Sequence, residues 1–434
     1  MHRLRAPDVR RFLPCIPLTL ILVATGALWS GTIAVAADAR WVATGAQEPG
    51  QPDKPVWSYA VSRAHPSLLL AATQGRGILR TADAGSTWVA VTPAVDATWV
   101  VRFDPQQPTV AYAGTQTDGF LKSVDEGKTW TSASQGLPSD VRSIDVIGTT
   151  IVVGTAQGVY DSSDAGATWH GLGLNDLDVS AVALLAKPHG FTIFAGADNG
   201  SAAAGYLLQS EDLSGSWRVM KSSVPADATV STIAVAPTPS GASQPPVIVG
   251  TSQGLFRTDD RGATWSPLNG LPTGDVNLVL FNPANADQIY AASDADQGNG
   301  GVFRSLDRGA SWTNLGAGLP ARPRVTALAL QPLSPPQLVM ATWNPTTGQA
   351  GAYRIPDAAA SVSGAGPSTA ASATVRPTVS ARATAQPATR PRAASLPPIS
   401  ASYVVVLAVL AAIGLYVLLR RWRIRREDRR TYAP

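Results

Sequence analysis

Short apolar runs recur along the chain at regular intervals, and most of them are too short to be helices. One group reads "STIAVAPT", "PVIVGT" and "GLFRTDD" between residues 231 and 260. The runs are rich in Val, Ile, Ala and Leu and are bounded by Gly, Pro, Asp and Asn, which is typical of β-strands separated by turns. Groups of this kind occur seven times between residues 57 and 357. The pattern predicts an all-β chain with three strands in each group.

A polar segment that ends in tryptophan follows the third run of six groups. The six segments are TADAGSTW, SVDEGKTW, SSDAGATW, SEDLSGSW, TDDRGATW and SLDRGASW. Asp, Ser and Thr side chains accept hydrogen bonds from nearby backbone N–H groups in tight turns, glycine tolerates a positive φ, and tryptophan buries a large apolar surface. These segments predict turns that lead into a fourth strand. The predicted structural residues are Asp83, Trp88, Asp125, Trp130, Asp164, Trp169, Asp212, Trp217, Asp260, Trp265, Asp307 and Trp312.

Four strands in each of seven units, at a period of about 40 to 50 residues, predict a seven-bladed β-propeller over residues 37–357. The seventh unit ends at Asp357 without a tryptophan, so its outer strand is missing. The sequence DARWVAT, from Asp38 to Thr44, looks like the GSTWVAV that forms an outer strand in the first unit. We therefore expect the N-terminal segment to pair with the last unit and close the ring, because closure removes exposed sheet edges.

The tryptophan segments resemble the Asp-box, or bacterial neuraminidase repeat, S/T-x-D-x-G-x-T/S-W; the fourth copy has Ser214 in place of the glycine. Residues 38–357 as a whole resemble seven-bladed Asp-box propellers of the photosystem II assembly-factor type. More distantly, they resemble sialidase and xyloglucanase propellers. The first resemblance implies a module that binds a partner on one face without catalysis. The others imply the alternative, a cell-surface glycoside hydrolase.

The stretch GAYRIPD, from Gly351 to Asp357, contains the Arg-Ile-Pro sequence found around the carboxylate-binding arginine of sialidases. In sialidases this arginine precedes the Asp-boxes, whereas Arg354 follows all of them. Arg354 also aligns with Arg80, Arg257 and Arg304 at one position of the third run. We therefore interpret Arg354 as a repeat position.

The two ends of the chain carry membrane-targeting patterns. Residues 1–36 combine an arginine-rich start, an apolar stretch and the small residues Ala34 and Ala36, which predicts a cleaved signal peptide. Residues 358–398 are rich in Ala, Ser, Thr and Pro and predict a disordered stalk. Residues 399–419 carry no charge and predict a transmembrane helix, and the arginines of the tail, 420–434, predict that this end is cytoplasmic. These patterns place the propeller outside the cytoplasm on a single membrane anchor.

Charge is distributed unevenly between these flanks and the central region. Of 34 basic and 30 acidic residues, 15 basic and 3 acidic ones lie in the flanks, which leaves 19 and 27 and a net charge of −8 for residues 37–357. An acidic propeller repels phosphate, so nucleic acid is excluded as a partner. The only cysteine lies within the signal peptide, the histidines are scattered, and no metal or cofactor is expected.

The loops opposite the repeat turns are expected to form the binding face for a protein partner or a glycan. They contain acidic and basic residues that we predict to form this face: Asp96, Asp118, Asp140, Asp178, Asp198, Asp275, Arg76, Arg322 and Arg324. Asp140, Asp178 and Asp275 recur just before the innermost strand, which favours a turn-capping role. The same three aspartates are the candidate catalytic carboxylates if the protein is a glycoside hydrolase.

Overall fold

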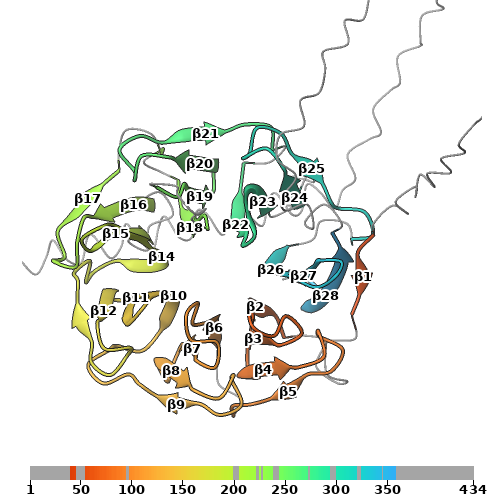
Figure 1. Ribbon diagram of the computed structural model, residues 1–434, viewed down its shortest axis with the longest axis horizontal. Helices are drawn as coiled ribbons and strands as arrows, with labels where there is room; N and C mark the ends of the chain where they lie inside the picture. Colours follow the sequence, from red (N-terminus) through yellow and green to blue (C-terminus); the bar gives the residue numbers. More distant parts are fainter. Residues whose placement is uncertain are drawn as a thin grey trace, which may run out of the picture. The chain divides into compact units, whose positions relative to one another are not determined.

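The computed structural model describes residues 40–44, 54–93, 97–198, 205–220, 224–225, 228–237, 244–271, 274–293, 300–319, 324–344 and 346–357. These residues form seven four-stranded antiparallel sheets arranged as blades around a central axis (Figure 1). The predicted all-β, seven-bladed propeller is confirmed. The described part of the chain contains no helix with the length and apolarity needed to cross a membrane. The predicted signal peptide, stalk, transmembrane helix and tail lie outside the described residues.

Each blade contributes one strand to each of four concentric positions. The innermost strands are β2 (Val56–Val61), β6 (Thr98–Phe103), β10 (Val141–Ile147), β14 (Asp178–Ala186), β18 (Val230–Val235), β22 (Val276–Asn282) and β26 (Val325–Gln331). The second strands are β3 (Leu69–Thr73), β7 (Ala111–Thr115), β11 (Thr150–Thr155), β15 (Phe191–Asp198), β19 (Val247–Thr251), β23 (Asn285–Ser293) and β27 (Gln337–Asn344). The third strands are β4 (Ile78–Thr81), β8 (Phe120–Ser123), β12 (Gly158–Ser162), β16 (Gly205–Ser210), β20 (Gly254–Thr258), β24 (Gly301–Ser305) and β28 (Gln349–Pro356). The outer strands are β5 (Val89–Ala90), β9 (Thr131–Ser132), β13 (His170–Gly171), β17 (Trp217–Val219), β21 (Ser266–Leu268), β25 (Thr313–Asn314) and β1 (Val42–Ala43).

Blades 1 to 6 each consist of four consecutive strands, from β2–β5 to β22–β25, and blade 7 consists of β26–β28 with β1. The second strands β3, β7, β11 and β19 are buried at every residue because sheets stack on both of their faces. This explains why their sequences are continuous apolar runs without alternation. The core therefore lies between neighbouring sheets, and the outer strands are only two or three residues long, which limits the exposed edges.

Blade 7 is completed by the N-terminal strand, as the sequence predicted. β1 pairs antiparallel with β28, with Val42 opposite Arg354 and Ala43 opposite Tyr353. Thr44 N donates to Ala352 O at 2.9 Å, and Trp41 is only 4% exposed. Figure 1 shows β1 at the outer edge of the last blade.

Trp41 takes the place of the tryptophan that the seventh repeat lacks. Its Nε1 donates to the backbone oxygen of Leu315 at 2.6 Å. Leu315 is the first residue after the outer strand of blade 6. Trp169 donates to Ala133 O at 2.8 Å, and Trp217 donates to Leu172 O at 2.6 Å. These carbonyls also follow the outer strand of the preceding blade. The indole N–H of each of these tryptophans thus ties its own blade to the preceding one.

Five of the repeat turns share one hydrogen-bond network, which blade 2 illustrates. Asp125 Oδ1 accepts from Ser123 Oγ at 2.8 Å and from Thr129 N at 2.9 Å, and Oδ2 accepts from Thr129 Oγ1 at 2.7 Å. Gly127 N donates to Ser123 Oγ at 2.9 Å. The same bonds recur around Asp83, Asp164, Asp260 and Asp307.

The backbone of these turns departs from the sequence expectation in one respect. Glycine was expected to supply the positive φ, but the residue before it is also left-handed, with φ of 63° at Glu126 and 58° at Ala165. The dense hydrogen bonds around the aspartate hold this conformation, which is unfavourable for residues with a side chain. The turn is therefore defined by two consecutive left-handed residues.

The fourth repeat turn differs from the others. Asp212 Oδ1 accepts only from Ser214 among the backbone donors that the structure describes, at 2.9 Å, and Ser210 Oγ donates to the backbone oxygen of Asp212. The sequence had shown that this copy lacks its glycine at Ser214. The missing glycine therefore coincides with the loss of the shared network.

A column of third-strand side chains links most blades to the next repeat turn. Arg80 Nε donates to Glu126 O at 2.9 Å and Lys122 Nζ to Ala165 O at 2.8 Å. Blade 3 has the buried Asp161 at this position. The next repeat turn after blade 3 is the irregular turn of blade 4. Arg354 has the register expected of this column, since it faces Val339 as Arg80 faces Leu70. The interpretation of Arg354 as a repeat position is confirmed.

Candidate functional site

Every innermost strand carries a β-bulge at its second or third residue, at the end of the blade opposite the repeat turns. The register between the first two strands shifts at this point in all seven blades. A bulge leaves one residue without a partner across the ladder and redirects its side chain, and bulges are frequent beside functional sites. The bulged residues are Trp57, Trp99, Arg142, Ser180, Ser231, Asn277 and Thr326.

These seven bulged residues divide the ring into two halves. Blades 1 to 3 carry large side chains, whereas blades 4 to 7 carry small polar ones. In the small half, Ser180 Oγ donates to Val230 O at 3.0 Å and Asn277 Nδ2 donates to Val325 O at 2.7 Å, so these side chains fasten the next blade. In the large half the side chains instead form a connected cluster.

The cluster of blades 1 to 4, which we name the rim cluster, consists of Trp57, Trp99, Asp140, Arg142 and Asp178. The rings of Trp57 and Trp99 are 5.8 Å apart between centroids and tilted by 51°. Trp99 Nε1 donates to Asp140 Oδ1 at 2.7 Å, and Arg142 Nη2 donates to Asp140 Oδ2 at 2.9 Å. Arg142 Nη1 also donates to Asp178. The rim cluster therefore runs without interruption over four blades.

The backbone at Asp140 is itself unusual, since its φ is 64°. A left-handed conformation is unfavourable for a residue with a side chain and persists only where surrounding contacts impose it. The hydrogen bonds from Trp99 and Arg142 supply those contacts. The rim cluster thus fixes the entry into blade 3.

Charge in the rim cluster is predominantly negative. Two carboxylates, Asp140 and Asp178, contact the single guanidinium of Arg142, and Asp198 lies opposite Asp178 in the β14–β15 ladder. Burial raises the pKa of Asp178, Arg142 opposes this effect, and the charge of Asp198 adds to it. Burial lowers the pKa of Arg142. Its hydrogen bond to Asp140 and the charge of Asp178 raise this pKa by a larger amount, so the net shift is upward.

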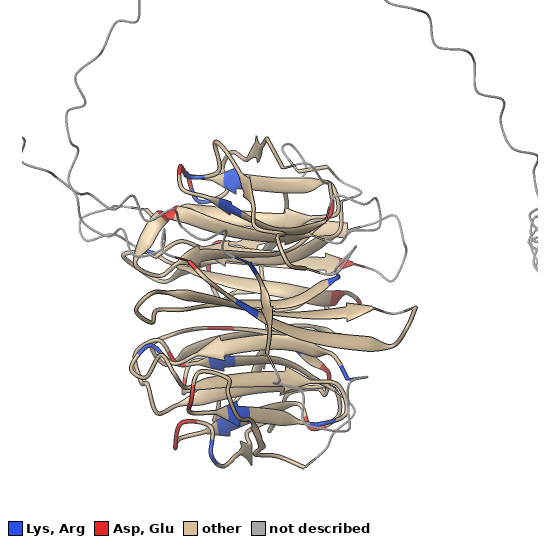
Figure 2. Cartoon of the chain, turned by 90° about the vertical axis from the view of Figure 1, so that its right-hand side faces the viewer, with Lys and Arg blue, Asp and Glu red and all other residues tan. Residues whose placement is uncertain are grey.

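The predicted binding-face residues that the structure describes lie at the expected end of the blades, but only some come together. Asp140, Asp178 and Asp198 gather at blades 3 and 4. Asp118 is exposed on blade 2, Asp275 and Arg324 are exposed at the entries to blades 6 and 7, and Arg76 is buried in blade 1. Asp96 and Arg322 lie outside the described residues. In the side view of Figure 2, charged residues of both signs occur at both ends of the strands.

Asp140 and Asp178 are less exposed than free loop carboxylates would be. The side chain of Asp178 is 30% exposed and that of Asp140 is 18% exposed, and both accept hydrogen bonds from Arg142. A carboxylate held by a guanidinium is stabilised as an acceptor. Within the described residues, no group of three or more His, Cys, Asp or Glu side chains is placed to hold a metal ion.

Sequence reasoning missed Trp57, Trp99 and Arg142 as site residues. A signal was present, because all seven bulged residues lie at the second or third position of an innermost strand, and four of them are Ser, Asn or Thr. A tryptophan or arginine in a column of small polar residues marks a position that has departed from the shared framework. The bulge itself could not be read from the sequence.

Comparisons with known proteins agree with the fold. No protein-family model matches the chain and no curated protein matches it, whereas solved structures do. YCF48 from Cyanidioschyzon merolae is 15% identical with a TM-score of 0.51, over 73% of this chain and 98% of that one. A structure of YCF48 bound to D1 peptide is also 15% identical, with a TM-score of 0.50, over 74% of this chain and 96% of that one.

Glycoside hydrolases of family GH74 are also among the similar structures. The enzyme from Niastella koreensis is 18% identical with a TM-score of 0.49, over 69% of this chain and 51% of that one. The xyloglucanase from Xanthomonas campestris is 18% identical with the same TM-score, over 67% of this chain and 51% of that one. The chain thus spans about half the length of these enzymes. At identities this low, the similarity to the YCF48 structures supports the fold alone: the chain is a seven-bladed β-propeller.

Proposed function

We propose that this protein is a membrane-anchored, extracytoplasmic Asp-box propeller that binds a segment of a partner protein at the rim cluster and catalyses no reaction. The observation that carries the proposal is the break in the bulge column, where Trp57, Trp99 and Arg142 replace small polar residues. Large rigid aromatic side chains and arginine are the groups that dominate binding energy at protein interfaces. A propeller similar in fold, YCF48, has been solved with a peptide bound.

The chemistry of the rim cluster favours a partner segment that combines a basic and an apolar side chain. The two half-buried indoles offer apolar surface and a face that attracts cations. The two carboxylates of Asp140 and Asp178 exceed the single charge of Arg142 and favour a positive group nearby. The sequence-derived anchor and stalk would hold this face outside the cytoplasm, where it can meet other envelope proteins.

The alternative, a glycoside hydrolase, has one observation in its favour. The pKa of Asp178 is raised by burial, and a raised pKa suits a general acid. Against it, Arg142 donates to both Asp140 and Asp178, so both carboxylates are already engaged by a guanidinium within the protein. We expect the wild-type protein to hydrolyse neither xyloglucan, β-glucan nor sialosides. Hydrolysis that is lost in Asp178→Asn but retained in Asp164→Ala, a repeat-turn variant, would establish the enzyme instead.

Site-specific photo-crosslinking in cells tests the binding proposal. A photoreactive phenylalanine is placed at Asp118, which is exposed on the same blade and face as Trp99, or at Val124, which is 67% exposed in a repeat turn. We expect a discrete adduct from position 118, identified by mass spectrometry, and no discrete adduct from position 124. Adduct formation only from position 124 would contradict the proposed face.

A second substitution shows whether the rim cluster makes the contact. Trp99→Ala should reduce the adduct from position 118 at least tenfold, because the indole supplies the apolar contact. Ser231→Ala is the matched control, since Ser231 occupies the same bulge position in blade 5, and it should leave the adduct unchanged. An adduct that survives Trp99→Ala in folded protein would rule out the rim cluster as the binding site.

A further inference from the structure

A cavity of about 1000 Å³ lies on the axis of the propeller, at the end that carries the repeat turns. Its walls are formed by the innermost strands of blades 1 to 6 and by the residues that follow them. A second cavity of about 310 Å³ shares Arg63 and Arg102 with it and extends the space to blade 7. Cavities of this size are typical of small-molecule sites. The rim cluster lies at the other end of the strands and does not line either cavity.

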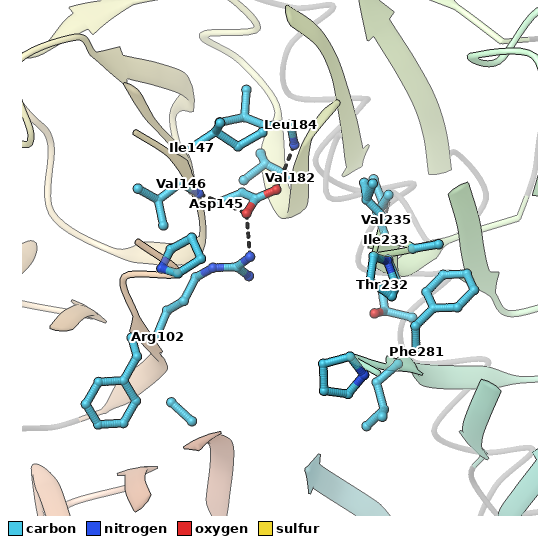
Figure 3. Close-up of a pocket in the computed structure, with 18 of the residues that line it drawn as sticks. Arg102, Asp145, Val146, Ile147, Val182, Leu184, Thr232, Ile233, Val235 and Phe281 are labelled. Atoms are coloured by element: carbon cyan, nitrogen blue, oxygen red, sulfur yellow. Dashed lines mark hydrogen bonds and ion pairs between the residues drawn. The ribbon is translucent and has the colours of Figure 1, made fainter. Parts of the chain in front are cut away.

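Most residues that line the larger cavity are apolar, although polar and apolar atoms contribute about equally to its surface. Figure 3 shows Thr232, Ile233, Val235 and Phe281 on one side and the side chains of Arg102 and Asp145 on the other. At the position of Arg102 and Asp145, the remaining innermost strands carry Ala or Leu: Ala60, Ala183, Ala234, Leu280 and Ala329. Charge therefore enters this column only in blades 2 and 3. As at the rim cluster, the departure from the repeat marks a local role.

Asp145 is fully engaged by neighbouring donors. Arg102 Nη2 lies 2.6 Å from Oδ1, Val146 N donates to Oδ1 at 2.8 Å, and Leu184 N of blade 4 donates to Oδ2 at 2.7 Å. The carboxylate held in this way fixes the guanidinium of Arg102 through its Nη2 atom. Its Nε and Nη1 have no partner among the described residues, and the side chain remains 44% exposed although it lines the cavity.

Arg63 adds a second positive charge at the outer end of the cavity. It is exposed, and no described residue pairs with it. Asp104 and Asp145 also line the larger cavity, but both are buried, and the Asp104 carboxylate accepts from Gln106 N, Gln107 N and Tyr112 Oη. The charged groups with exposed surface at the cavity are therefore the two guanidinium groups, and the planar fork of an arginine that is already oriented suits a carboxylate.

We propose that this cavity binds a monocarboxylate with an apolar body, of the size of a medium-chain fatty acid. The carboxylate accepts hydrogen bonds from the unengaged N–H groups of Arg102, with Arg63 beside it, and the apolar body lies against Ile233, Val235 and Phe281. The proposal is independent of the partner-binding role of the rim cluster, because the two sites occupy opposite ends of the blades and share no residue.

Isothermal titration of the full chain with octanoate tests the proposal, with octanol and octylammonium as neutral and cationic controls. We expect saturable binding of one octanoate and at least tenfold weaker binding of both controls. Arg102→Gln should weaken octanoate binding at least tenfold. Arg354→Gln, which removes an exposed arginine of blade 7 outside the cavity, should leave it unchanged. Absence of octanoate binding, or equal binding of octanol, would overturn the proposal.

A second variant covers the case in which Arg102→Gln fails to fold, since Arg102 also bridges blades 2 and 3. Thr232→Glu places a carboxylate on the opposite wall, where it competes for Arg102 without disturbing the Arg102–Asp145 pair. We expect this variant to lose octanoate binding at least tenfold. Unchanged octanoate binding in Thr232→Glu, or in folded Arg102→Gln, would show that Arg102 does not recognise the carboxylate.

Discussion

At the repeat-turn end of the propeller, five blades make the same four hydrogen bonds around an aspartate, whereas at the opposite end the seven bulged residues are of five different kinds. Both ends therefore use a repeated backbone feature, a turn or a bulge. Only the repeat-turn end repeats the side chains as well. Uniform side chains indicate a demand that these five blades share, namely the turn that connects the third and fourth strands. Divergent side chains on a uniform backbone indicate a local role.

The largest expected difference between the two ends concerns their tryptophans. Trp41→Ala should lower the free energy of unfolding by about 3–5 kcal/mol, because a buried indole and its bond to Leu315 are lost together. Trp57→Ala at the rim cluster should cost far less, since that side chain is half-buried. Thermal and urea unfolding of the two variants measures the difference. Equal losses would mean that the rim tryptophan also belongs to the shared framework.

The next effect concerns the repeat-turn aspartates and depends on pH. Asp125→Ala should lower stability at neutral pH by about 1–2 kcal/mol, because the variant loses the several hydrogen bonds that this half-buried carboxylate accepts. Backbone and side-chain hydrogen bonds from Thr129 and Ser123 lower the pKa of Asp125 to about 2, from 3.8. A lowered folded-state pKa contributes stability above the unfolded value that is lost as pH falls. The difference from wild type should therefore shrink between pH 4 and pH 2.

Asp212→Ala in the irregular fourth turn is the control for this experiment. Its carboxylate accepts from a single described backbone donor, Ser214, so its loss should be smaller and less dependent on pH. Urea unfolding at several pH values compares both variants. If Asp212→Ala destabilises as much as Asp125→Ala, the shared network is not the source of the stability.

The smallest effect distinguishes two arginines of the same column. Arg80→Ala should cost about 1 kcal/mol, because its Nε donates to Glu126 O of the next turn. Arg354→Ala should change stability by less than about 0.5 kcal/mol, since the side chain is exposed and makes no bond with any described residue. Differential scanning calorimetry resolves the two. A larger loss at Arg354 would indicate a contact that gives this position a role of its own.

Most of the fold could be predicted because its determinants are local and repeated. The spacing of Asp125, Gly127 and Trp130 recurs in other copies, so the turn and the fourth strand could be recognised from sequence alone. The pairing of Trp41 with blade 7 was also predictable, because the seventh repeat lacked one element and the N-terminus supplied a matching one. The sequence thus encodes closure of the ring by a strand that is missing from the seventh repeat and an additional strand at the N-terminus.

The rim cluster was only partly predictable, for a physical reason. Asp140, Asp178 and Asp198 were expected on the binding face and do come together, but their association with Trp99 and Arg142 depends on bulges and on contacts between blades. Such contacts join residues about forty positions apart, as Trp99 and Asp140 are. The Arg102–Asp145 pair was missed for the same reason, because it joins two neighbouring blades. Neither residue is unusual within its own strand.

The pairing of β1 with β28 has a consequence for how the chain is made. Synthesis delivers the N-terminus first, yet the residues that Trp41 and Val42 contact belong to blades 6 and 7, and Leu315 lies 274 positions away from Trp41. The first strand to emerge must therefore remain unpaired until the last blade has followed it, and the ring can be sealed only in a late step. Contacts over such separations slow folding because a long loop must close before they form. Until that step, blade 7 exposes the edge of β28, so the newly made propeller is most vulnerable to misassociation and proteolysis just before β1 and β28 meet.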